Sequence, residues 1–220
     1  MWRLTALFAT LVLLASCGLL GREASYRYRL TIEAETSRGG MQGSGVLEEV
    51  ATLTPIRVGD STGKGGATRG EAIVIDLPSG PVFALLELPN AGGPLGSAVT
   101  MALAPDAAGS ERSDYIDAVR RLGGWFSSAT AELPRAQWPL MVRFRDLNDP
   151  TSVTQVEPEA LGISHVRLET TGEEVSTGIR SKLPWLIDGG LTLDPQGGPT
   201  SNPTFAQTLR QRVFTTEIRR

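Results

Sequence analysis

Few side chains in this sequence of 220 residues are suited to nucleophilic, acid–base or metal chemistry. There is one cysteine, Cys17, and one histidine, His165, beside 24 acidic residues. A serine–histidine–aspartate triad, or a zinc site built on histidines, would have to use His165. Gly43-Ser44-Gly45 lacks the spacing of the G-x-S-x-G motif, and GDSTG, residues 59–63, has the spacing but is followed by a strand pattern instead of the helix that a nucleophile elbow requires. We therefore expect no metal ligand and no cofactor, and we expect His165 to be a surface residue of a strand.

Two stretches approach known ligand-binding motifs without matching them. GDSTGKGG, residues 59–66, differs from a phosphate loop because Gly59 and Gly63 are one residue too close, and because a strand pattern follows. DLNDPTSVTQVE, from residue 146, begins like a calcium loop, but Thr151 occupies the position where the sharp turn requires glycine. We interpret the first stretch as the end of a hairpin and the second as a turn.

Two alternatives remain open at the level of single residues. Two carboxyl groups facing each other across a cleft, about 5 to 9.5 Å apart, would suit hydrolysis of a cell-wall glycan. Sequence spacing cannot select one such pair from 24 acidic residues, so no catalytic residue is assigned. Trp185, in KLPWLIDGG, fits either a plug over the end of a core or an anchor for a binding partner.

The beginning of the sequence has the pattern of an export signal. Met1-Trp2-Arg3 carries one basic side chain and precedes LTALFATLVLL, residues 4–14, which is apolar apart from two threonines. This run has the length of a signal-peptide core and is short for a membrane span, which needs about 20 apolar residues. Leu14-Ala15-Ser16-Cys17 then presents an aliphatic residue, two small residues and a nucleophilic thiol that can accept a diacylglyceryl group.

Leu14-Ala15-Ser16-Cys17 resembles the lipobox of bacterial lipoproteins. The resemblance implies a signal peptide over residues 1–16, lipidation of Cys17, and an anchor with a short linker over residues 17–25. Stable anchoring takes two lipid signals, so the three acyl chains of such proteins would hold this one permanently. Gly18, in the place of the aspartate that favours inner-membrane retention, favours the outer membrane. An uncleaved membrane helix over residues 4–20 is the alternative.

Composition indicates a globular protein with partners other than nucleic acid. Hydrophobic residues make up 40% of the sequence and charged residues 20%, which is typical of a folded domain. The net charge of −3 argues against nucleic acid. The length predicts a single domain, over residues 26–220. The expected partners are the membrane, through lipidated Cys17, and another component of the cell envelope.

Alternation of apolar and polar residues predicts mostly β structure. YRYRLTIEAET, residues 26–36, alternates tyrosine and aliphatic residues with polar ones, as in a half-buried strand. GSGVLEEVATLTPIRV, residues 43–58, is the expected partner strand, and residues 59–70 form a polar, glycine-rich loop. EAIVIDL and GPVFALLEL predict a second hairpin around residues 78–80.

Helices are expected to be few. Ser113 is placed to cap DYIDAVRRLGG, residues 114–124, and a short helical turn is expected near Pro158. PLMVRFRDL and SHVRLETT predict further strands. Residues 205–213 have helical spacing, but RVFTTEI fits a strand equally well. The predicted fold is therefore α+β, mostly antiparallel β-sheet in hairpins with one or two short helices.

Three stretches of the body also resemble known proteins. YRYRLTIEAET, MVRFRDLNDPTSVTQVEPEALG and GIRSKLPWL are together similar to an uncharacterised group of proteobacterial proteins, over most of residues 26–187. That group has no known activity, so the resemblance implies no functional residue. The sequence predicts a lipid-anchored, periplasm-facing envelope protein with a binding or structural role rather than a catalytic one. A membrane-anchored hydrolase that uses a carboxylate pair is the alternative.

Overall fold

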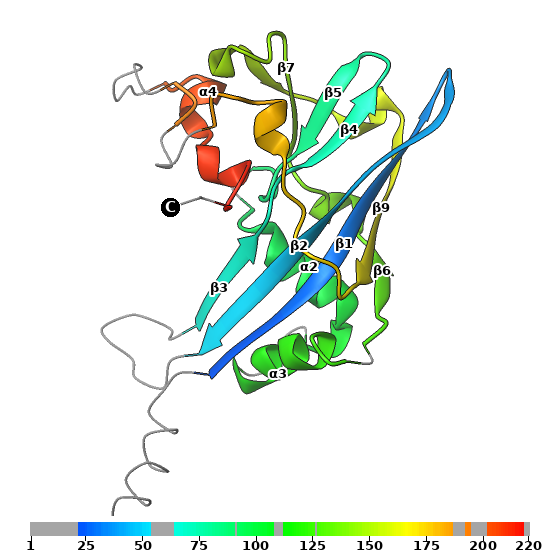
Figure 1. Cartoon of the computed structure of the whole chain (residues 1–220), viewed down its shortest axis with the longest axis vertical. Helices are drawn as coiled ribbons and strands as arrows, with labels where there is room; N and C mark the ends of the chain where they lie inside the picture. Colours follow the sequence, from blue (N-terminus) through cyan, green and yellow to red (C-terminus); the bar gives the residue numbers. More distant parts are fainter. Residues whose placement is uncertain are drawn as a thin grey trace, which may run out of the picture.

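Two antiparallel sheets form the body of the protein. The computed structural model describes residues 22–53, 64–90, 92–107, 112–125, 127–186, 192–194 and 202–217. Within these ranges the first sheet has the strand order β3-β2-β1-β9-β6 and the second the order β4-β5-β7-β8 (Figure 1). The predicted α+β class, with mostly antiparallel strands, is confirmed.

The elements have the following bounds. The first sheet contains β1 (Arg22–Thr36), β2 (Gly39–Leu53), β3 (Lys64–Arg69), β6 (Thr130–Glu132) and β9 (Ile163–Thr170). The second contains β4 (Ile73–Leu77), β5 (Gly80–Ala84), β7 (Met141–Phe144) and β8 (Val153–Gln155). The helices of the described ranges are α2 (Leu95–Leu103), α3 (Arg112–Leu122) and α4 (Phe205–Thr208). Short 3-10 turns are η1 (Pro105–Ala107), η2 (Arg135–Gln137), η3 (Pro150–Ser152), η4 (Pro158–Leu161), η5 (Ile179–Ser181) and η6 (Gln211–Val213).

The hairpin of β1 and β2 is the longest feature of the fold. Each strand has 15 residues, and the register pairs Arg22 with Leu53 at one end and Thr36 with Gly39 at the turn. The face predicted from alternation is buried: Tyr26, Tyr28, Leu30, Ile32 and Ala34. Because successive side chains of a strand point to opposite faces, the intervening charged residues remain half-buried or exposed on the outer face.

Helices α2 and α3 cover the inner face of the first sheet (Figure 1). Val99 of α2 and Val119 of α3 are fully buried in the same core cluster as Leu30 and Leu47 of the hairpin. Helix α3 confirms the predicted helix, but it begins at Arg112, so Ser113 lies within the helix and its prediction as the cap is wrong. Helix α2 was missed, because LGSAVTMAL consists largely of small and apolar residues with no polar face to reveal a helical period.

The second sheet lies between two hydrophobic cores. Ile73 and Ile75 of β4 belong to the core under the helices, whereas Phe83 of β5 belongs to a second core. The second core is closed by C-terminal segments that include Leu183 and Phe214. Both sheets are thus covered on at least one face, and β5 is buried on both faces.

Gly43 allows the two sheets to meet closely. A β-carbon at Gly43 would lie 2.3 Å from the carbonyl oxygen of Val74 and 2.8 Å from Cγ1 of Ile75. No side chain fits in that space, so glycine is required where β4 crosses β2. The Gly43-Ser44-Gly45 stretch is therefore a packing contact between the sheets.

Three expectations need correction or fall outside the described residues. A loop was expected over residues 59–70, but residues 64–69 form β3, which pairs with Glu48–Leu53 of β2. Gly65 and Gly66 interrupt the alternation of apolar and polar residues that indicates a strand, but main-chain pairing does not depend on that alternation. Residues 22–25 were expected to belong to the linker, but they are part of β1, because their main chain pairs with residues 50–53 of β2. The leader and Cys17 lie outside the described residues.

Candidate functional site

His165 lies on the outer face of the first sheet, as expected for a surface residue of a strand. Its Nδ1 is 2.7 Å from Oε1 of Glu132 on the neighbouring strand β6, and its side chain is 43% exposed. On the same face, Arg167 of β9 forms an ion pair of 3.0 Å with Glu33 of β1. These pairs join three adjacent strands through exposed side chains, which contribute little to stability.

A hollow on this outer face is lined by several acidic residues, and two of them form ion pairs with basic side chains. Its volume is about 460 Å³, and Glu33, Glu132 and Glu169 are among its lining residues. Glu33 binds Arg167 and Glu132 binds His165. A carboxylate pair for hydrolysis needs one acid kept protonated by its surroundings. In this hollow Glu33 and Glu132 are instead engaged by basic side chains, so the arrangement does not favour that chemistry.

A more apolar pocket, here called the α2–α3 pocket, opens between two helices and the ends of β2 and β3. It is lined by Ala51, Thr52, Leu53, Gly65, Gly66, Ser97, Met101, Tyr115 and Ile116. None of these residues carries a charge, and the pocket has a volume of about 260 Å³. This volume lies slightly below the range typical of small-molecule sites. The pocket is therefore suited to a single apolar group.

A buried carboxyl group lies beside the α2–α3 pocket. Glu49 of β2 is only 3% exposed, and its Oε2 accepts a hydrogen bond of 2.9 Å from Oγ1 of Thr68. A β-carbon at Gly66, which lines the pocket, would lie 3.4 Å from Oε1 of Glu49. Desolvation raises the pKa of Glu49 from 4.5 to about 7, although the hydrogen bond from Thr68 opposes the rise.

The first turn of α2 rests directly on this carboxyl group. A β-carbon at Gly96 would lie 1.8 Å from Oε2 of Glu49, so only glycine permits the contact. The period-2 pattern of VLEEVA could have revealed this acid, because Glu49 shares its face with Leu47 and Ala51. Sequence reasoning did not single out Glu49, since the pattern alone does not show what covers that face.

Hydroxyl groups continue the polar cluster beneath α2. The hydroxyl groups of Tyr26 and Thr100 are 2.9 Å apart, and Thr100 donates to the carbonyl oxygen of Gly96 at 2.9 Å. Tyr115 reaches the same threonine at 3.5 Å. The buried hydroxyl of Tyr28 has no hydrogen-bond partner in the described part of the chain. Burial raises the pKa of Tyr26 and Tyr115, so both rings remain neutral hydrogen-bonding groups.

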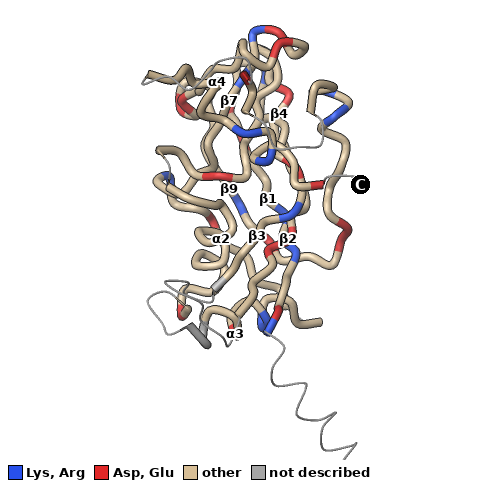
Figure 2. Tube along the Cα trace, turned by 90° about the vertical axis from the view of Figure 1, so that its left-hand side faces the viewer, with Lys and Arg blue, Asp and Glu red and all other residues tan. Residues whose placement is uncertain are grey.

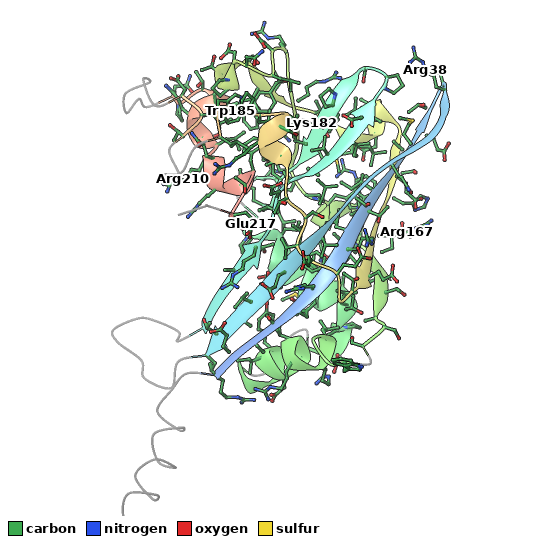
Figure 3. The ribbon with its side chains drawn as sticks, viewed as in Figure 1. Arg38, Arg167, Lys182, Trp185, Arg210 and Glu217 are labelled. Atoms are coloured by element: carbon green, nitrogen blue, oxygen red, sulfur yellow. The ribbon has the colours of Figure 1, made fainter. Side chains whose placement is uncertain are left out.

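Trp185 is a plug of the second core. Its ring contacts those of Phe144 and Phe214, with centroids 5.5 and 5.9 Å away, and its Nε1 donates to the carbonyl oxygen of Leu147 at 2.8 Å. The residue lies in the part of the molecule formed by the C-terminal segments (Figure 3). Of the two interpretations of Trp185, the contacts favour the plug.

The calcium-like stretch forms a turn, as predicted. Asp146 accepts a hydrogen bond of 2.9 Å from the main-chain nitrogen of Asn148, and Asp149 accepts one of 2.9 Å from that of Thr151. The two carboxylates thus stabilise the turn through local main-chain contacts. Among the described residues, no group of three potential metal ligands gathers anywhere.

The fold and the site define an α+β protein with an uncharged pocket between α2, α3 and the ends of β2 and β3. No family model, curated protein or solved structure matches the chain. No helix within the described ranges is long and apolar enough to cross a membrane. The resemblances to bacterial lipoproteins and to a proteobacterial group therefore stay predictions from the sequence.

Proposed function

We propose that this chain is a lipid-anchored protein of the cell envelope that binds an apolar group of another envelope component in the α2–α3 pocket, without catalysing a reaction. The uncharged lining of this pocket is the observation that carries the binding role. The Leu14-Ala15-Ser16-Cys17 stretch supports the anchor, facing the periplasm and placed in the outer membrane rather than the inner one.

The surroundings of the pocket suit binding rather than catalysis. Met101, at the rim, is one of two large apolar side chains that the described part of the chain exposes. Methionine adapts its shape to different apolar groups. Glu49 carries no charge below its raised pKa, so it does not repel an apolar group next to the pocket. The alternative of a carboxylate hydrolase has less support, because Glu33 and Glu132 are held by bases.

The anchor is tested by replacing the proposed lipidation residue. In a Gram-negative host fed labelled palmitate, we expect the full chain to take up label and to partition with outer membranes. Cys17→Ala is expected to lose the label completely, because this is the only cysteine in the sequence. If both forms are unlabelled and both remain in the membrane, residues 4–20 are an uncleaved helix and the anchor proposal is wrong.

The pocket is tested by photocrosslinking of the full chain in cells. A benzophenone side chain at Met101 is expected to form an adduct, whose added mass identifies the bound class of molecule. Ser97→Trp places a large ring in the pocket lining and is expected to abolish the adduct by occupying the space. Ser164→Trp, on the exposed face of β9, is the matched control and should leave the adduct unchanged. Equal adducts in both variants would contradict binding in the pocket.

A further inference from the structure

Two large apolar side chains are exposed in the described part of the chain, and they lie at the same end of the molecule. Trp125, which follows α3, is 94% exposed, and Met101 of α2 is 43% exposed. Tryptophan is on average a highly buried residue. Met101 also lines the α2–α3 pocket together with Leu53, the last residue of β2. The exposure of both side chains at one end of the molecule indicates a surface that contacts a partner.

The same end contains the first residues of the described chain. Gly123 lies against β1, because a β-carbon there would be 2.2 Å from the carbonyl oxygen of Ser25. Arg22, at the start of β1, forms an ion pair of 2.5 Å with Asp117 of α3. Figure 1 shows α3 beside the start of β1 and the end of β2, and Figure 3 shows Arg38, at the hairpin turn, at the opposite end of these strands. We call Arg22–Ser25, α3 and Trp125 the α3 end.

We propose that the α3 end lies against the lipid headgroups, with Trp125 in the membrane interface. This inference rests on the proposed lipid anchor. Five peptide units separate Cys17 from Arg22, and a fully extended chain of that length spans at most about 18 Å. Acyl chains on Cys17 would therefore keep the start of β1, and the helix paired with it, close to the bilayer surface.

The chemistry of the α3 end fits an interface with lipid headgroups. Tryptophan is enriched at membrane–water interfaces, where its ring is partly apolar and its N–H can reach a polar partner. Arg22, Arg120 and Arg121 are exposed, and their guanidinium groups can bind phosphates. Their ion pairs with Asp117 and Asp106 hold them at this end.

Charge does not oppose this orientation, although the whole chain carries −3. Basic and acidic residues both occur along α3 and the start of β1 (Figure 2). Arg22, Arg120 and Arg121 are balanced by Asp106, Asp117 and the exposed Glu23, so this surface is close to neutral. The attraction is therefore expected to come mainly from Trp125, with a smaller, salt-dependent contribution from arginine.

Tryptophan fluorescence of the membrane-bound protein tests the proposal. The full chain is produced in a Gram-negative host, purified from membranes in detergent, and reconstituted into vesicles of phosphatidylethanolamine and phosphatidylglycerol with brominated or ordinary acyl chains. We expect brominated lipid to quench part of the emission of the wild type. Trp125→Phe is expected to lose this quenching, and it should fold normally because the ring is exposed. Trp185→Phe, in the second core, should retain the quenching.

The mass of the N-terminal peptide, measured on the same samples, separates the two proposals. An acylated chain whose Trp125-dependent emission is quenched supports both. An acylated chain with the same emission in brominated and ordinary vesicles overturns the membrane-facing α3 end and leaves the anchor intact. An unacylated chain contradicts the anchor, and it also overturns this inference because the limit on distance from the bilayer is lost.

Discussion

Replacing Glu49 by glutamine is expected to stabilise the protein at pH 8 and to leave its stability at pH 5 nearly unchanged. The pKa of Glu49 is about 7 in the folded protein, against an ordinary value of 4.5. The folded state therefore binds the proton more tightly, and the contribution of Glu49 to stability is lost as the pH rises from about 4.5 to 7. The full loss is about 3 kcal/mol. Glutamine carries no charge at any of these pH values and still offers an oxygen to Thr68.

Urea unfolding between pH 5 and pH 8 measures this effect. The wild type is expected to lose stability over this range, and Glu49→Gln to lose less. Glu71 is also a buried acid whose pKa is raised by desolvation, so the slope of the wild type has more than one source. The difference between the wild type and the variant isolates Glu49. Glu169→Gln, on the exposed face of β9, provides the control. Identical slopes for wild type and Glu49→Gln would show that Glu49 is not held neutral by burial.

Gly43→Val is expected to destabilise the protein by about 3 kcal/mol or more, because the contact it disrupts involves main-chain atoms. The first carbon of any side chain at Gly43 would lie 2.3 Å from the carbonyl oxygen of Val74. A flexible side chain could rotate away from such a contact, but a strand in a sheet has to move as a unit. The displacement would separate β4 from β2 and open the core that they share.

The matched control for this variant lies on the same strand. A β-carbon at Gly40 would come no closer than 3.7 Å, to a side-chain oxygen of Glu35. Gly40→Val is therefore expected to change stability by only about 0.5 kcal/mol. The urea midpoints of the two variants give the comparison. If both unfold at the same urea concentration, the close approach of the two sheets does not hold in solution.

Local patterns were sufficient to predict the strands of the two hairpins. In β1, every second residue from Tyr26 to Ala34 is apolar, and all five of these side chains are buried. A strand with one buried face needs only this alternation, because its main-chain bonds form whatever the side chains are. Helix α3 was predicted for a related reason: Ile116 and Val119 share one face of a short segment whose other residues are mostly polar.

The candidate site could not be predicted in the same way, because its parts are distant in sequence. Thr68 and Gly96 contact the carboxyl group of Glu49 from β3 and α2, and both elements were missed. Their sequences are rich in small residues, which conceal the periodicity. Small residues are also what permits the close contacts, since a side chain at Gly96 would displace the carboxyl group.

The sequence by itself determined the class of fold, the alternation of the main strands and the lipobox-like stretch ending at Cys17. These features depend on neighbouring residues alone. Only the tertiary structure decided that α2 covers Glu49, that the α2–α3 pocket opens beside it, and that Trp125 lies near the start of β1. The reason is physical: desolvation and close packing depend on which segments, distant in sequence, contact each other, and local periodicity does not specify those contacts.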